Sequence, residues 1–249
     1  MNVSEPSRIG RNPLRVLVRT AIAVVRARTT VLFPLLLSAP ALHATDSITW
    51  TGGGGADQKV TTPANWSGEL DLGAPLKIQF ESALQHIIEL HSNFLPSGLL
   101  PISQITFLDT GDGNRPDYTF IGTGDHTPTL SLLGDVTVQR GGHITFGGSL
   151  SISLSRGTTH TISIAHANTT VTVDGIITET GLGHASITKS GAGTLLLKAA
   201  NTFSGEIVIE EGTIKIGTDA ALGTGDLTFD GGTLHTTATF HLNRHRGIL

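Results

Sequence analysis

The sequence predicts an all-β solenoid, a fold in which short strands wind into coils that stack on one another. Three observations indicate this fold: apolar residues alternate with polar ones, glycine closes each short strand, and the strand pattern repeats. The repeat is clearest from Ile187 to Leu234, where apolar pairs put two side chains on one face of each strand. The pairs are Leu195/Leu197, Ile207/Ile209, Ile214/Ile216 and Leu227/Phe229, followed by Leu234.

Every second strand in this stretch begins a near-constant step after its counterpart. Leu195 to Ile214 is 19 residues, and Ile214 to Leu234 is 20 residues. A step of this length lies at the lower edge of the periods that indicate a solenoid. From Leu130 onward the shorter strand spacing fits either a sandwich or a solenoid. The downstream step favours the solenoid.

The composition agrees with many short strands and tight turns. The 249 residues include 31 glycines and no cysteine, with only 14% charged and 38% apolar residues. A helical bundle would need more Glu, Lys and Ala. Without disulfides, an exported chain of this kind must be stabilised by its core and its ladder hydrogen bonds.

Residues 1–44 are interpreted as a secretory signal peptide that is cut after Ala44, with a cut after Ala41 as the alternative. They contain a single acid, and the apolar run Val31 to Leu37 precedes the small residues before Ala44. This order of basic, apolar and small segments is typical of an export signal. A membrane anchor is the alternative, but the apolar run is short and Pro34 and Pro40 interrupt it. The six arginines of this segment are Arg8, Arg11, Arg15, Arg19, Arg26 and Arg28.

Removal of this segment makes the chain distinctly acidic. Lys plus Arg falls from 16 to 10 and Asp plus Glu from 20 to 19, which leaves a formal charge of −9. An acidic, aromatic-poor surface argues against nucleic acid and anionic lipid as partners, because both require basic patches. The mature chain is also expected to contain no transmembrane helix.

Residues 45–128 are expected to form an amino-terminal cap and irregular early coils. Trp50 and Trp66 flank a glycine-rich loop, and two large indoles suit the covering of a first coil. The segment from His86 to Leu90 fits either a strand or a short helix. Residues 129–249 are expected to form the regular solenoid. Its upstream apolar positions are Leu130/Leu132, Val136/Val138, Ile144/Phe146, Ile152/Leu154, Ile162/Ile164, Val171/Val173, Ile176 and Ile187.

At residues 187–234 the sequence resembles the autotransporter-associated β-strand repeat of bacterial surface proteins. The resemblance rests on KSGAGTL from Lys189, ANTFSG from Ala200 and EGTIKIG from Glu211, in the order and spacing of that family. It implies a single-stranded right-handed parallel β-helix that is exported and then displayed or released at the outer surface. Such proteins often carry many repeats and a carboxyl-terminal translocator barrel. The chain is therefore expected to be the amino-terminal piece of a longer protein, without that barrel.

Candidate metal ligands are few and poorly ordered in the sequence. The glycine loop from Gly52 to Asp57 partly matches a calcium-binding β-roll repeat, but Lys59 stands where an apolar residue is required. Asp109, Asp112, Asn114 and Asp117 offer oxygen ligands without the EF-hand order. His241 and His245 have zinc-ligand spacing for a helix, but the surrounding sequence reads as strand and arginines adjoin them. The sequence therefore predicts no metal site and no cofactor.

Catalytic candidates are equally sparse. Glu206, Glu210 and Glu211 are the nearest approach to a sugar-cleaving carboxylate set. Adjacent acids on an acidic chain are more simply solubilising, and GLGHAS at Gly181 lacks the third glycine of a dinucleotide-binding fingerprint. The predicted function is a non-catalytic surface scaffold or adhesin whose partners are surface glycans or other cells. The alternative is a carbohydrate-active β-helix enzyme, either a lyase or a hydrolase.

Overall fold

The structure is a computed structural model that describes residues 47–51, 53, 59–68, 71, 74–81, 86–95, 98–109 and 117–249. All of these residues belong to one compact unit, which spans residues 42–249. The signal peptide predicted over residues 1–44 lies outside the described residues.

Within these ranges the regular structure consists of β-strands and three short 3₁₀ helices. The 3₁₀ helices are η2 (Pro63–Asn65), η3 (Ser92–Phe94) and η5 (Asp219–Leu222). The strands are β1 (Ser47–Trp50), β2 (Leu76–Phe80), β3 (His86–His91), β4 (Leu99–Phe107), β5 (Tyr118–Thr123), β6 (Thr129–Leu132), β7 (Val136–Val138), β8 (His143–Phe146), β9 (Ser151–Ser155), β10 (Thr159–Ile164), β11 (Thr170–Val173), β12 (Ile177–Thr180), β13 (Ser186–Ser190), β14 (Thr194–Leu197), β15 (Ile207–Ile209), β16 (Thr213–Ile216), β17 (Leu227–Phe229) and β18 (Thr233–Thr236).

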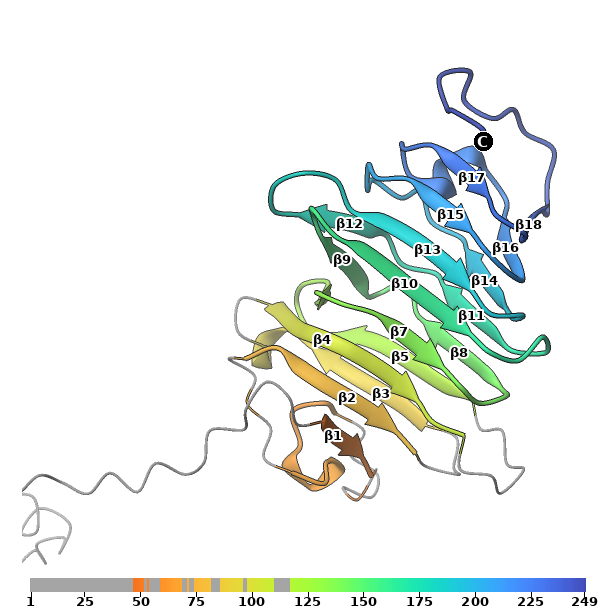
Figure 1. Cartoon of the computed structure of the whole chain (residues 1–249). Coiled ribbons are helices and arrows are strands. Elements are labelled where there is room, and N and C mark those ends of the chain that lie inside the picture. The colour runs from red at the N-terminus through yellow and green to blue at the C-terminus, as the bar shows by residue number, and fades with distance from the viewer. Residues whose placement is uncertain are drawn as a thin grey trace, which may run out of the picture. The chain divides into compact units, whose positions relative to one another are not determined.

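The strands stack into three faces in which all the pairings between named strands are parallel (Figure 1). Face A contains β1, β2, the second half of β4, β7, β10, β13, β15 and β17. Face B contains β3, β5, β8, β11, β14, β16 and β18. Face C contains the first half of β4, then β6, β9 and β12. The chain visits the faces in turn, and this confirms the predicted parallel β-solenoid.

The alternating apolar pattern produces columns of side chains inside the coils. Ile187, Ile207 and Leu227 lie in register on neighbouring strands of face A, and the steps between them are equal in length. All three are fully buried, because residues in register on neighbouring strands point to the same side of the sheet. The repeat that the sequence predicted is therefore one coil of the solenoid.

Two local expectations are resolved by the structure. The segment from His86 to Leu90 belongs to strand β3 rather than to a helix. The inward assignment of Ile176 is wrong, because the strand begins one residue later and Ile177 takes the inward position opposite Ile152. Ile176 is 46% exposed as a result.

Aromatic rings fill the early coils. Phe80 stacks on Phe107 with ring centroids 4.8 Å apart, and Trp50 meets Trp66 edge to face at 5.0 Å. The Trp66 indole N–H donates to the Val60 carbonyl at 2.8 Å. Both indoles are buried in the first described coil, the place expected for a cap. The division of the chain at residue 128 stays a prediction. Strand β4, before that residue, pairs with β6 on face C and with β7 on face A, both of which follow it.

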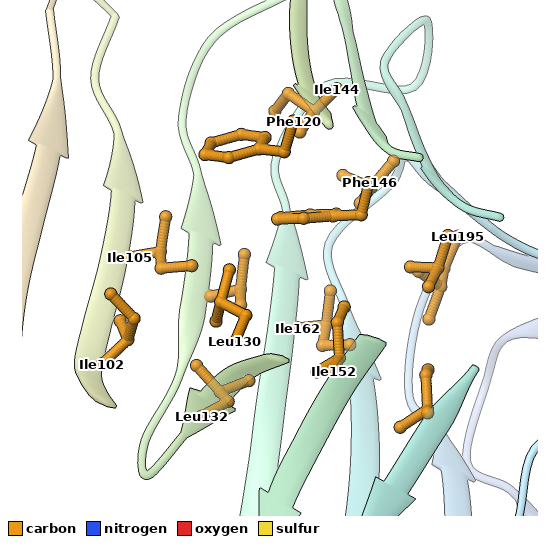
Figure 2. Close-up of a cluster of buried hydrophobic side chains, with 14 of the residues drawn as sticks. Ile102, Ile105, Phe120, Leu130, Leu132, Ile144, Phe146, Ile152, Ile162 and Leu195 are labelled. Carbon is orange, nitrogen blue, oxygen red and sulfur yellow. The ribbon is translucent and has the colours of Figure 1, made fainter. Parts of the chain in front are cut away.

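The interior of the middle coils is a continuous apolar cluster (Figure 2). Phe120 and Phe146 stack at 4.8 Å, above aliphatic side chains that come from all three faces. A cavity of about 30 Å³ lies among these side chains. Its lining is entirely apolar, so it is expected to be dry.

Face C ends at β12, and a compact corner takes its place in the following coils. Asn201 is buried there, and its side chain accepts from the Ile177 N–H at 2.8 Å and donates to the Ala221 carbonyl at 2.6 Å. Phe203 points inward and is fully buried. Backbone bonds such as Thr202 N–H to the Ile177 carbonyl at 3.0 Å hold the corner on the coil before it.

Candidate functional site

The calcium candidates lie largely outside the described residues. Most of the loop from Gly52 to Asp57 is not described, nor are Asp112 and Asn114. Asp117 is described, and its carboxylate accepts the His143 backbone N–H at 2.7 Å. In the described part of the chain, no group of three or more His, Asp or Glu side chains is arranged to hold a metal ion.

His241 and His245 lie in an exposed segment after β18. The interpretation of this segment as strand is wrong, because residues 237–247 carry no strand. Its buried residue is Arg246, whose guanidinium binds the Asp219 carboxylate at 3.1 and 3.2 Å and the Gly223 carbonyl at 2.8 Å. Burial by itself would raise the pKa of Asp219, but the hydrogen bonds from Arg246 and the Asn243 backbone, together with the Arg246 charge, outweigh burial and lower that pKa. The arginine thus attaches the end segment to the corner at η5.

The three glutamates considered for sugar cleavage have separate surroundings. Glu206 accepts a hydrogen bond from the Thr228 hydroxyl of the following coil. Strand β15 ends at Ile209, so Glu210 and Glu211 lie on the following turn, where both are exposed.

A polar cluster at the corner between faces C and A connects titratable side chains of several coils. This corner cluster consists of Arg156, Glu179, His184, Ala185 and Ser204. Glu179 Oε1 lies 2.8 Å from the Arg156 guanidinium and 2.6 Å from the Ser204 hydroxyl. Glu179 Oε2 accepts the Ala185 N–H at 2.9 Å, and His184 Nδ1 lies 2.6 Å from the Ser204 Oγ. These residues come from three successive coils.

The environment of Glu179 keeps it ionised. Its side chain is 2% exposed, and burial by itself raises the pKa of a carboxyl. The hydrogen bonds from Ser204, Ala185 and Arg156 outweigh burial and lower the pKa of Glu179 from 4.5 to about 2. A carboxylate of this kind is a weak base and a strong hydrogen-bond acceptor.

The order of contacts in the corner cluster differs from that of a nucleophilic triad. In a triad the serine donates to the histidine and the carboxylate orients the histidine. Here Ser204 donates to Glu179, so its oxygen is left to accept from His184. The arrangement therefore ties the GLGHAS loop and the ANTFSG corner to β12. Glu179 was not singled out from the sequence.

Lys189, within the KSGAGTL motif, is fully buried. Its ammonium donates to the carbonyls of Ser190 at 2.8 Å, Gly191 at 2.5 Å and Glu211 at 3.1 Å. Burial lowers the pKa of Lys189 to about 8, and the nearby Glu211 charge opposes that shift. The sequence could have predicted the burial of Lys189. It stands two residues after Ile187 on the same strand, so its side chain points to the same inward side.

The turn around Lys189 requires glycine. Gly191 and Gly212 have φ values of 72° and 70°, a backbone region that other residues rarely adopt. A Cβ added to Gly212 would lie 2.4 Å from the Gly191 carbonyl oxygen of the coil before it. The glycines of KSGAG and EEG therefore allow successive turns to stack closely over the buried ammonium.

The outward side of face B is lined by threonine. Thr170, Thr194, Thr213 and Thr233 lie in register on β11, β14, β16 and β18. A second outward column contains Thr145 on β8, Thr172 on β11 and Leu196 on β14. We call these two columns the threonine face.

The described residues include no helix with the length and apolar character required to cross a bilayer.

Residues 187–216 match the family described as passenger-associated-transport-repeat. The chain carries an autotransporter-associated repeat. The repeat runs from Ile187 in β13 to Ile216 in β16, so it contains the Lys189 turn, the ANTFSG corner and two strands of the threonine face. The geometry described above for this segment is thus the geometry of a recognised repeat.

A longer similarity connects the chain to an autotransporter adhesin. The chain is 35% identical over 149 residues to the adhesin BmaC autotransporter of Brucella suis biovar 1 (strain 1330). The similarity covers 55% of this chain and 4% of that adhesin, so the chain spans a small part of its relative's length. No solved structure matches the chain significantly.

Proposed function

We propose that the chain is part of an exported passenger whose β-solenoid presents an adhesive surface outside the cell and catalyses no reaction. The observation that carries the proposal is the transport repeat at residues 187–216, which occurs within an uninterrupted parallel stack. The similarity to an autotransporter adhesin extends well beyond that repeat.

The form of the solenoid supports an adhesive role. Most of its apolar residues are buried in the interior of the coils. The outer surfaces of its strands are long and regular and consist mainly of short polar side chains. Surfaces of this kind can contact an extended partner over many coils. Surface glycans or other cells are the partners we propose, and the acidic mature chain disfavours nucleic acid.

Export is tested by expressing the full chain in a Gram-negative host with an affinity tag at the carboxyl end. Intact-mass analysis is expected to show a precursor and a mature form shorter by the predicted signal peptide of residues 1–44. A protein that keeps Met1 and remains in the cytosol would contradict the export step.

Adhesion is tested with the purified mature protein on beads and cultured host cells. Coated beads are expected to bind cells more than beads coated with an unrelated acidic protein. Equal binding by both would contradict the adhesive role. Turnover of a polysaccharide panel, abolished by Glu206→Gln, would replace the proposal with the enzymatic alternative.

A further inference from the structure

The threonine face has hydroxyl groups that the protein itself does not use. Among the described residues, the side chains of Thr145, Thr170, Thr172, Thr194 and Thr213 make no hydrogen bond to another protein atom. Face C differs, since the Ser153 hydroxyl donates to Thr180 Oγ1 at 3.2 Å and Thr178 Oγ1 donates to the Ile152 carbonyl at 3.4 Å. The hydroxyls of the threonine face are thus open to solvent or to a partner.

The threonine face is also uncharged across its centre. Within its two columns, charged or titratable side chains lie at Asp117 and His143 before Thr170, and at Lys215 and His235 after Leu196. The Asp174 carboxylate and the Lys198 ammonium, 2.8 Å apart, neutralise each other just beyond Thr172 and Leu196. The Asp117 carboxylate is occupied by the His143 N–H. A charged ligand would therefore gain little at the centre of this surface.

Face A provides a contrast within the same coils. Its outward positions also include hydroxyls, but an acid that accepts a hydrogen bond from the next coil stands immediately before each of β7, β15 and β17. These acids are Asp135, Glu206 and Asp226. Face A consequently carries acids along its edge, whereas the two columns of face B contain only threonine and Leu196 on β11 and β14.

The spacing of the threonine face suits an extended polymer. Neighbouring strands are about 4.8 Å apart, and outward residues of one strand are about 6.6 Å apart. A sugar unit in an extended glycan has a length close to the strand spacing. A glycan that runs along the solenoid axis would thus offer about one sugar to each coil.

The chemistry of the surface matches that of a neutral sugar. Threonine hydroxyls donate and accept hydrogen bonds, as sugar hydroxyls do. Their methyl groups, with Leu196, can contact the apolar C–H side of a sugar ring. Threonine side chains also lose little rotamer freedom on binding, because branching at Cβ already restricts them.

We propose that the threonine face binds an extended, uncharged polysaccharide aligned with the solenoid axis. This inference rests on the proposed adhesive function and names its ligand class. The strands involved are β8, β11, β14 and β16, which follow one another in a single stack in Figure 1. Successive coils of face B would bind successive sugars.

The test uses the full mature chain and two matched triple variants. Thr170→Val/Thr194→Val/Thr213→Val removes three hydroxyls from face B and keeps side-chain shape and strand propensity. Thr106→Val/Thr137→Val/Thr188→Val makes the same change on outward positions of face A. Circular dichroism and thermal melting establish that both variants fold as the parent does.

Binding is measured by calorimetry with a β-1,4-linked glucose hexamer and with an oligogalacturonate of equal length. We expect the neutral hexamer to bind and the acidic one to bind at least about tenfold more weakly. The face B variant should lose at least about tenfold in affinity for the hexamer, while the face A variant should match the parent.

Three results would overturn the inference: no binding of the hexamer, equal binding of the acidic oligomer, or equal loss in both variants. The bead assay separates this failure from failure of the proposed function. If the coated beads still bind cells but the protein has no affinity for the hexamer, the adhesive function is supported and the proposed polysaccharide ligand is contradicted. Loss of both activities would remove both proposals.

Discussion

The coils up to β12 and the coils after it differ in how they complete a turn of the solenoid. In the earlier coils three strands make one turn, which carries the chain on face A from Val138 to its register partner Ile164. In the later coils two strands and a corner make one turn, which carries the chain from Ile187 to its register partner Ile207. The later turn uses fewer residues. Faces A and B continue through both regions, so the change is confined to face C.

This difference explains the period of the transport repeat. A strand of face C satisfies its backbone groups through a ladder, whereas the corner uses the Asn201 side chain to bond Ile177 on one side and Ala221 on the other. One amide thus replaces part of a ladder, and the coil becomes shorter. The short period of the repeat is the length of a coil that lacks a third strand.

The two regions also differ in packing. Inward residues of the later coils, such as Ile207 and Ile214, are fully buried. The cavity of about 30 Å³ is lined mostly by residues of the earlier coils, with Ile187 and Leu195 of the first later coil on one side. The fully buried Phe203 fills the corner of the later coils. We therefore expect the later coils to be the more stable part of the chain.

The largest expected effect is a charge between the later coils. Leu197→Asp buries an unpaired carboxylate and should cost about 4 kcal/mol or more of unfolding free energy. Leu196→Asp is the control, since Leu196 points outward on the same strand. Urea unfolding measures both, and equal effects would mean that the inward assignment of Leu197 is incorrect.

Asn201→Ala tests the corner itself. It leaves the Ile177 N–H and the Ala221 carbonyl buried without their partner, which should cost about 2–3 kcal/mol. The exposed neighbour change Thr202→Ala should be close to neutral. If both variants unfold at the same urea concentration, the side chain does not replace the ladder.

Glu179→Gln tests the corner cluster at the junction of the two regions through its pH dependence. The pKa of Glu179 is about 2 in the folded chain and ordinarily 4.5, so its ionised form stabilises the fold above about pH 4.5. That stabilisation, about 2–3 kcal/mol, should be lost as the pH falls toward 2. Wild type should therefore lose more stability than the variant between pH 6 and pH 3 in urea titrations. The control Glu210→Gln should follow wild type, and parallel curves for all three proteins would contradict this assignment.

The smallest effect concerns the cavity. Val171→Ile adds a methyl group to a residue that lines the cavity and should stabilise the earlier coils by about 0.5–1 kcal/mol. Ile214→Phe enlarges a side chain in the filled later coils and should cost about 1–3 kcal/mol. Effects of the same sign on the thermal midpoint would mean that the two regions are packed alike.

Much of this fold could be predicted from short-range patterns. Ile187, Ile207 and Leu227 were recognised because apolar alternation and glycine turns are properties of neighbouring residues. The absence of face C from the later coils could not be predicted from the sequence. It depends on hydrogen bonds from Asn201 to Ile177 and Ala221, which belong to two other coils. Glu179 was missed for the same reason, since its partners come from the coils on either side.

The candidate site was less predictable than the fold. His241 and His245 attracted attention through their spacing, but Arg246 beside them makes the buried contacts. The threonine column emerges only when the register places Thr170 opposite Thr194 and Thr194 opposite Thr213, two steps of different length along the chain. Unequal coil lengths hide such a column from any search at a fixed period.

The most direct test of the account is disulfide formation across this column. The natural chain has no cysteine, so any disulfide within a double-cysteine variant must join the two introduced residues. Thr170→Cys/Thr194→Cys and Thr194→Cys/Thr213→Cys join neighbouring strands in register, about 4.8 Å apart, a separation that a disulfide can bridge. Thr170→Cys/Thr213→Cys spans two strands and is too distant. Copper-phenanthroline oxidation followed by mass spectrometry should show cross-links in the first two variants and none in the third. A cross-link in the third variant alone would contradict the continuous face B on which the account depends.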